Sequence, residues 1–91
     1  MIIARRFRVA GRVQGVGFRW FTEEAALREG VSGHVRNLPD GSVEAEVEGE
    51  ADAILRFERA LRQGPRAARV ESVDVTELSP TGRVTRFRIV G

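Results

Sequence analysis

The sequence predicts a small α+β domain in which two helices pack on one face of an antiparallel sheet. Three observations lead to this prediction: segments that alternate apolar and polar residues, two segments with helical spacing between them, and turns rich in glycine and proline at their junctions. Because the chain has 91 residues, we expect a single domain, residues 1–91, around one core.

The first segment, residues 3–13, alternates as a half-buried strand does. One face carries apolar side chains and the other carries arginines. The apolar set is Ile3, Phe7, Val9 and Val13, and the basic set is Arg6, Arg8 and Arg12. A helix is expected from Arg19 to Glu29, with Gly30 as its C-terminal stop. Within it, Trp20 and Phe21 are expected to pack in the core.

A hairpin is expected next, because two alternating segments flank a turn. Val31–Leu38 runs into Pro39-Asp40-Gly41, and Ser42–Glu48 returns. The outer face of the returning strand carries three glutamates, namely Glu44, Glu46 and Glu48. They mirror the three arginines of the first segment. We therefore expect these two strands to be neighbours with opposite charges facing each other.

A second helix is expected from Ala51 to Gln63, ended by Gly64-Pro65. Its apolar stripe is Ile54, Phe57 and Leu61. Two strands follow, Arg69–Leu78 and Val84–Val90. The resulting order, βαββαβ plus one strand, is that of a ferredoxin-like sandwich with an extra C-terminal strand. This fold serves enzymes, RNA-binding modules and sensors alike, so the function has to be inferred from a site.

The composition limits the chemistry. The chain has no cysteine and one histidine, His34, so neither a disulfide nor a metal site is expected, and no cofactor is predicted. All 15 basic residues are arginines, spread among 13 acidic residues, and the net charge is +2. This pattern argues against a nucleic-acid partner. Because no apolar run reaches membrane-spanning length, we expect a cytoplasmic protein without a membrane partner.

The run Gly11-Arg12-Val13-Gln14-Gly15-Val16-Gly17-Phe18-Arg19 carries the first strand into a glycine-rich turn that ends on a guanidinium. Glycines let backbone N–H groups turn inward, a helix start adds unpaired N–H groups, and arginine offers a fork that matches phosphate oxygens. The sequence therefore predicts an anion cradle. It is not a Walker loop, because the chain has no lysine, and not a dinucleotide fingerprint, because residue 20 is tryptophan.

Together with the run from Gly33 to Glu44, this motif resembles the acylphosphatase family, and the resemblance covers essentially the whole chain. It implies hydrolysis of the carboxyl-phosphate bond of acyl phosphates by direct attack of a positioned water, with Arg19 and Asn37 as catalytic residues. The residues implied in phosphate binding are Gln14, Gly15, Val16, Gly17, Phe18 and Arg19. At His34 the chain departs from the family pattern, in which an aromatic residue is more common.

The implied roles agree with the chemistry of phosphoryl transfer. Arg19 would neutralise charge on the equatorial oxygens, and the amide of Asn37 would orient the water. No strong general acid is needed, because the leaving carboxylate has a pKa of about 4. The implied partners are a small-molecule acyl phosphate and, as product, inorganic phosphate, and we expect a monomer.

Three other classes of protein stay open at this point. An RNA-binding module would carry its stacking aromatics on the central strands, where this sequence has arginine and glutamate. A phosphate sensor would share the cradle but would not need Asn37. A larger maturation or carbamoyl-transfer protein would use such a domain as its N-terminal part.

Overall fold

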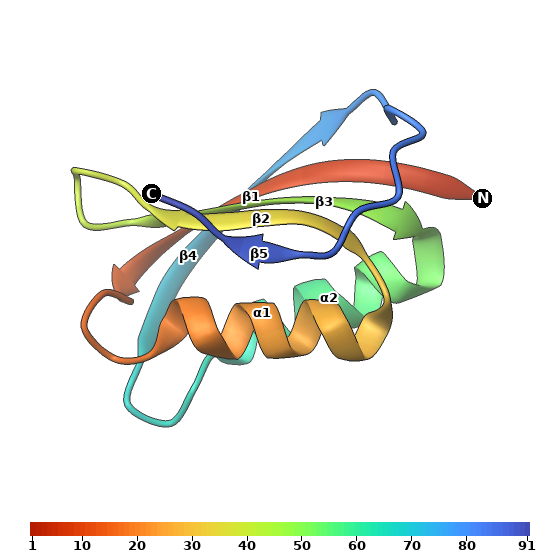
Figure 1. The fold of residues 1–91 in the computed structure, drawn as a ribbon. Coiled ribbons are helices and arrows are strands. Elements are labelled where there is room, and N and C mark those ends of the chain that lie inside the picture. Colours follow the sequence, from red (N-terminus) through yellow and green to blue (C-terminus); the bar gives the residue numbers. More distant parts are fainter.

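A computed structural model describes residues 1–91, and it shows a sheet with both helices on one of its faces (Figure 1). The order of the elements is the predicted one, so the ferredoxin-like fold is confirmed. The elements are β1 (Ile2–Arg12), α1 (Phe18–Glu29), β2 (Ser32–Asn37), β3 (Val43–Glu50), α2 (Ala51–Gln63), β4 (Arg69–Leu78) and β5 (Arg88–Ile89). Neither helix is long and apolar enough to cross a lipid bilayer.

The strand order in the sheet is β4-β1-β3-β2-β5. The first four strands pair antiparallel, whereas β5 pairs parallel to β2, with His34 opposite Arg88. The sheet is therefore mixed, and the prediction of an antiparallel sheet holds for four of its strands. The parallel pair arises because the chain crosses from the β4 edge to the β2 edge before it forms β5 (Figure 1).

The predicted strand Val84–Val90 is mostly wrong, because only Arg88–Ile89 is a strand. The crossing segment before it is held by side chains of the sheet and not by strand pairing. The Glu48 carboxylate accepts hydrogen bonds from the backbone N–H groups of Thr81 and Gly82, at 2.7 and 2.8 Å. The N–H of Thr85 donates to Ser32 Oγ at 3.0 Å.

The predicted facing of opposite charges between β1 and β3 is confirmed in register for two of the three arginines, although Arg8 forms its ion pairs with Asp40 and Asp74. Arg6 lies opposite Glu46 and Arg8 lies opposite Glu44, and Arg6 Nε is 2.8 Å from a Glu46 carboxylate oxygen. Arg12 lies beyond the end of this register and faces Arg69 of β4 instead. Such pairs on the open face of a sheet contribute modestly to stability.

The core lies between the sheet and the two helices, and three phenylalanines form its centre. The rings of Phe7 and Phe87 each lie 6.0 Å from the ring of Phe57. The stripe predicted for α2 is confirmed, because its three apolar residues are fully buried. These aromatic contacts join β1, α2 and the segment before β5 into one unit.

The buried face of α1 differs from the predicted one. The helix begins at Phe18, one residue earlier than expected, and it buries Phe18, Thr22, Ala25 and Ala26. Trp20 follows Phe18 by about 200° around the helix, so it points to solvent and is 78% exposed. The prediction that Trp20 packs in the core is therefore wrong. Phe21 is half-buried, with its ring 6.1 Å from that of Phe18.

Candidate active site

The β1–α1 loop and the end of β2 lie at the same end of the molecule (Figure 1). Between them is a hollow of about 170 Å³, here called the cradle hollow. The residues that line it are Val13, Gly15, Gly17, Phe18, Arg19, Trp20 and Asn37. The fold thus brings together the two predicted catalytic residues, Arg19 and Asn37, which come from separate motifs.

The backbone of the cradle is built on two glycines with positive φ, Gly15 at 74° and Gly17 at 76°. A Cβ atom added at either position would meet nothing within 4 Å, so the turn needs glycine for its backbone conformation and not for space. Gly17 is the N-cap of α1 and no side chain caps the helix. The N–H groups of the first turn therefore lack intrahelical partners and, with the helix dipole, favour an anion.

Arg19 carries a guanidinium that forms no ion pair. Six other arginines of the chain pair with carboxylates, and Arg19 is the only unpaired arginine that lines the cradle hollow. The paired ones are Arg5, Arg6, Arg8, Arg36, Arg56 and Arg62. Arg19 is half-buried and lines the cradle hollow, and its guanidinium donors are free to bind an anion in a bidentate way.

Asn37 is the last residue of β2, and its side chain has an unusual environment. The Oδ1 atom is buried but has no hydrogen-bond partner in the protein. Leaving a buried acceptor without a partner costs about 1–3 kcal/mol, so such atoms are rare in folded proteins. An unpaired amide oxygen on the cradle hollow is suited to accept a hydrogen bond from a small polar molecule.

Gln14 connects the cradle to the turn between β2 and β3. Its Nε2 atom donates to the backbone oxygens of Leu38 and Ser42, at 2.8 and 2.9 Å. Both protons of the amide are engaged there, so only the backbone of Gln14 is available to a phosphate. Val16 packs against the core. Of the predicted phosphate-binding residues, Gly15, Gly17, Phe18 and Arg19 line the hollow, whereas Gln14 and Val16 do not.

Sequence reasoning missed Trp20 as a residue of this site. It lines the cradle hollow beside Arg19, but the pattern of the helix suggested a core position. The signal that could have revealed it is the spacing of Phe18, Thr22 and Ala25, which defines a buried face that excludes residue 20.

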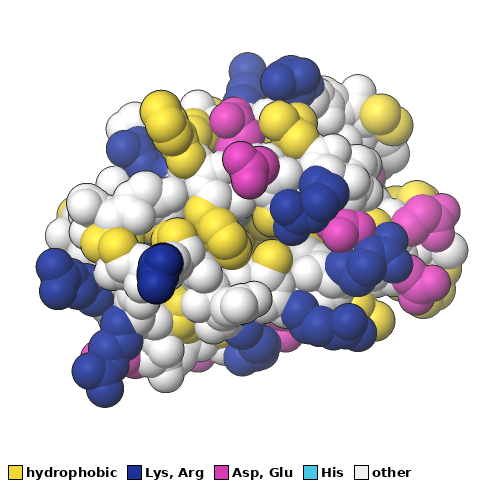
Figure 2. Space-filling model, turned by 90° about the horizontal axis from the view of Figure 1, so that it is seen from below, with side chains coloured by type: hydrophobic (Ala, Val, Ile, Leu, Met, Phe, Trp, Pro, Cys, Tyr) yellow, Lys and Arg dark blue, Asp and Glu magenta, His cyan; other side chains and the backbone are white.

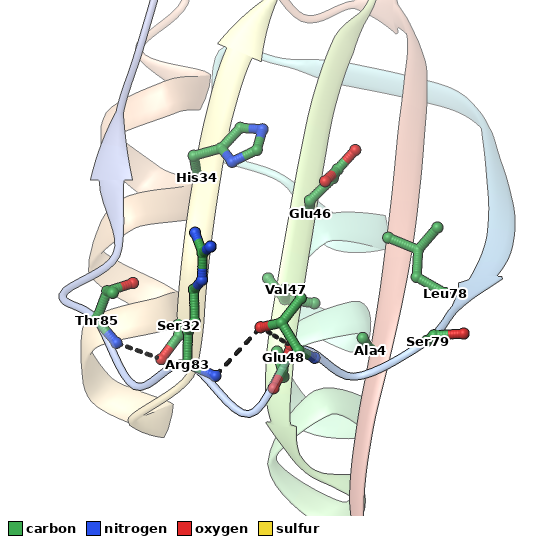
Figure 3. Close-up of a pocket in the computed structure, with 12 residues that line it drawn as sticks. Ala4, Ser32, His34, Glu46, Val47, Glu48, Leu78, Ser79, Arg83 and Thr85 are labelled. Atoms are coloured by element: carbon green, nitrogen blue, oxygen red, sulfur yellow. Dashed lines mark hydrogen bonds between the residues drawn. The ribbon is translucent and has the colours of Figure 1, made fainter.

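A second hollow, of about 260 Å³, lies on the open face of the sheet and shares no residue with the cradle hollow. Figure 3 shows His34 and Glu46 projecting from neighbouring strands there, above Arg83. Ligand atoms of His34, Glu44 and Glu46 lie within 4.8 Å of one another. Arg6 and Arg36 pair with the two carboxylates, at 2.8 Å to Glu46 and 3.0 Å to Glu44, so these groups already have cationic partners.

Comparison with known proteins decides the family. The model of the family described as acylphosphatase matches residues 5–89. The chain belongs to the acylphosphatase family. It is 49% identical over 87 residues to the acylphosphatase of Anaeromyxobacter dehalogenans, and this match covers 96% of the chain and 94% of the relative. Like the acylphosphatases it matches, the chain is an enzyme that hydrolyses acyl phosphates to a carboxylate and inorganic phosphate.

Solved structures agree with this assignment. The crystal structure of acylphosphatase from Bacillus subtilis superposes with a TM-score of 0.94 at 38% identity, covering 100% of both chains. The same domain also resembles part of a much longer protein. HypF from T. kodakarensis matches with a TM-score of 0.85 at 33% identity, over 98% of this acylphosphatase chain but 12% of HypF.

Proposed function

We propose that acyl phosphate hydrolysis takes place in the cradle hollow, with Arg19 binding the phosphoryl group and Asn37 orienting the water that attacks it. One observation carries the proposal: the unpaired guanidinium of Arg19 and the unpaired, buried Oδ1 of Asn37 line the same hollow at an uncapped helix N-terminus. A group that carries negative charge and a water with a proton to donate would satisfy both.

The proposed step needs only positioning and charge neutralisation. Backbone N–H groups of the cradle and the Arg19 fork hold the phosphoryl oxygens, and Asn37 Oδ1 accepts a hydrogen bond from the water. The water oxygen forms a bond to phosphorus while the bond between phosphorus and the acyl oxygen breaks. The carboxylate leaves with the electron pair of that bond, and both water protons end on the phosphate, which departs as H₂PO₄⁻.

The proposed reaction uses no general acid and no metal ion. The leaving carboxylate is a weak base with a conjugate-acid pKa of about 4, so it does not need a proton to depart. In keeping with this, no carboxylate or imidazole lines the cradle hollow, and His34 lies on the open face of the sheet. Arg19 and the N–H groups supply the positive potential that a metal ion supplies in other phosphoryl-transfer enzymes.

We also propose that residues 1–91 form one domain that acts as a cytoplasmic monomer, with small acyl phosphates as its only partners. The absence of cysteine suits a reducing compartment. On the helix side, arginines are scattered among acidic and apolar side chains and form no continuous basic tract (Figure 2), which disfavours nucleic-acid binding.

The test is phosphate release from acetyl phosphate in water enriched in ¹⁸O, with and without a chelator. The proposal predicts release well above the uncatalysed rate, unchanged by the chelator, with the label in phosphate and none in acetate. Label in acetate would show attack at the carbonyl carbon and would contradict the proposed step. Phosphate binding without release would favour a phosphate sensor instead.

A further inference from the structure

We propose that the indole of Trp20 binds the acyl part of the substrate, and that the enzyme therefore favours acyl phosphates with a flat apolar acyl group, such as benzoyl phosphate, over acetyl phosphate. The proposal rests on the assignment of the reaction to the cradle hollow. It adds a residue that selects among substrates to the residues that carry the chemistry.

The position of Trp20 is the first step of the argument. It is the only tryptophan of the chain and is 78% exposed. It is the third residue of α1, and side chains on a helix lean toward the N-terminal end. The indole therefore leans toward the cradle, and it lines the same hollow as Arg19 and Asn37.

The other lining residues offer no apolar surface to a substrate. Val13 and Phe18 are each 1% exposed, because their side chains belong to the core. Gly15 and Gly17 have no side chain, and the remaining two residues are polar. Trp20 is therefore the one exposed apolar side chain on the cradle hollow.

The geometry of the reaction places the acyl group where only such a surface can hold it. The cradle binds the phosphoryl end, so the acyl end has to project toward the mouth of the hollow. The ring pairs of the protein involve phenylalanines alone, and Trp20 is mostly exposed, so its indole has surface available for stacking. A planar acyl group gains from such stacking, whereas a methyl group offers little area for it.

The first experiment compares benzoyl phosphate with acetyl phosphate in four proteins: wild type, Trp20→Ala, Trp20→Phe and Leu27→Ala. Leu27 is the matched control, because it is a 40% exposed apolar residue on the same helix but does not line the hollow. We expect Trp20→Ala to raise KM for benzoyl phosphate about tenfold and to leave KM for acetyl phosphate nearly unchanged. We expect kcat of Trp20→Ala to stay within about twofold of the wild-type value for both substrates, since the reacting groups are untouched.

Trp20→Phe should keep most of the preference, because it keeps an aromatic face, and Leu27→Ala should behave as wild type. A parallel change in KM for both substrates, or no change in either, would overturn the role of Trp20. Neither of these results would touch the proposed hydrolysis. Failure of the hydrolysis itself would appear as no turnover of either substrate by the wild type.

A binding measurement decides the point independently of turnover. The chain has one tryptophan and no tyrosine, so its intrinsic fluorescence reports Trp20 alone. We expect benzoylphosphonate, which lacks the scissile oxygen bridge, to quench this fluorescence in a saturable way and to bind about tenfold more tightly than acetylphosphonate. Equal affinities, or saturable benzoylphosphonate binding with unchanged emission, would overturn the proposal.

Discussion

Arg19 and Asn37 line the same hollow, and neither the Arg19 guanidinium nor the Oδ1 atom of Asn37 has a partner within the chain. Asn37 Oδ1 is buried and unpaired, and Arg19 forms no ion pair although ten ion pairs exist elsewhere in the molecule. Unsatisfied polar groups cost stability, and they persist most readily where a ligand satisfies them. At the residue scale, the active-site assignment depends on these two side chains.

The substitution Arg19→Lys separates charge from geometry at the cradle. Lysine keeps the positive charge but loses the planar fork, so we expect kcat/KM for acetyl phosphate to fall by about a hundredfold, equivalent to about 3 kcal/mol of barrier. The thermal midpoint should be unchanged, because Arg19 makes no ion pair. Arg12→Lys is the control, since Arg12 is an exposed arginine at the end of β1 that forms no ion pair and does not line the cradle hollow. An Arg19→Lys enzyme with wild-type kcat/KM would remove Arg19 from the mechanism.

At the scale of elements, the site depends on the relative placement of α1 and β2. Gln14 provides a direct connection, through its hydrogen bonds to the carbonyls of Leu38 and Ser42 on either side of the β2–β3 turn. Asp40 orders the same turn by accepting hydrogen bonds from the backbone N–H and the hydroxyl of Ser42, at 2.9 and 2.6 Å. The distance between Arg19 and Asn37 is thus set by residues that do not line the hollow.

Replacing Gln14 by alanine should therefore affect catalysis without touching the substrate. We expect the free energy of unfolding to fall by about 1 kcal/mol, because both hydrogen bonds from Gln14 to the β2–β3 turn are lost. We expect kcat to fall about tenfold, because Asn37 is less well placed relative to the phosphoryl group. Gln63→Ala, at the exposed end of α2, is the control and should change neither quantity. Loss of stability with an unchanged kcat would show that Gln14 acts on the fold alone.

At the scale of the whole molecule, the charges of the open sheet face and its turns are paired across strands. The hydrogen bonds from the Ser42 hydroxyl and N–H, with the Arg8 guanidinium, hold the pKa of Asp40 well below its usual range. Hydrogen bonds from the backbone of Thr81 and Gly82 lower the pKa of Glu48. A carboxyl with a lowered pKa in the folded state stabilises the protein above its unfolded pKa and loses this contribution as the pH falls.

Acid should therefore destabilise this protein in part through Asp40. We expect the urea midpoint of the wild type to fall between about pH 5 and about pH 3, where unfolded carboxyl groups take up protons and the folded Asp40 does not. In Asp40→Asn this fall should be smaller, since the group no longer titrates. Glu71→Gln, at an exposed β4 carboxylate without an ion pair, is the control. If the urea midpoint fell equally with pH in Asp40→Asn and in the wild type, the role assigned to Asp40 would be contradicted.

Local patterns predicted much of this molecule. Alternation in β1 and β3 predicted their pairing, and the resemblance of two motifs to the acylphosphatase family implied that Arg19 and Asn37 belong to one site. The parallel β5 and the crossing segment before it were beyond such reasoning. Glu48 and Ser32 hold the crossing segment, and β2 pairs with β5, through contacts distant in sequence. The exposure of Trp20 was missed because α1 buries small residues, Thr22, Ala25 and Ala26, whose pattern is weak.

The central claim is that Asn37 turns a phosphate-binding cradle into an enzyme, and Asn37→Ala tests it most directly. Two quantities are measured on the same folded protein: kcat for acetyl phosphate and the dissociation constant of inorganic phosphate, with a thermal melt to confirm folding. We predict that kcat falls by about a hundredfold or more while phosphate affinity changes by less than about twofold, because the cradle and Arg19 are intact and only the water loses its orientation. Full turnover in a folded Asn37→Ala protein, or a parallel loss of phosphate affinity, would contradict the account.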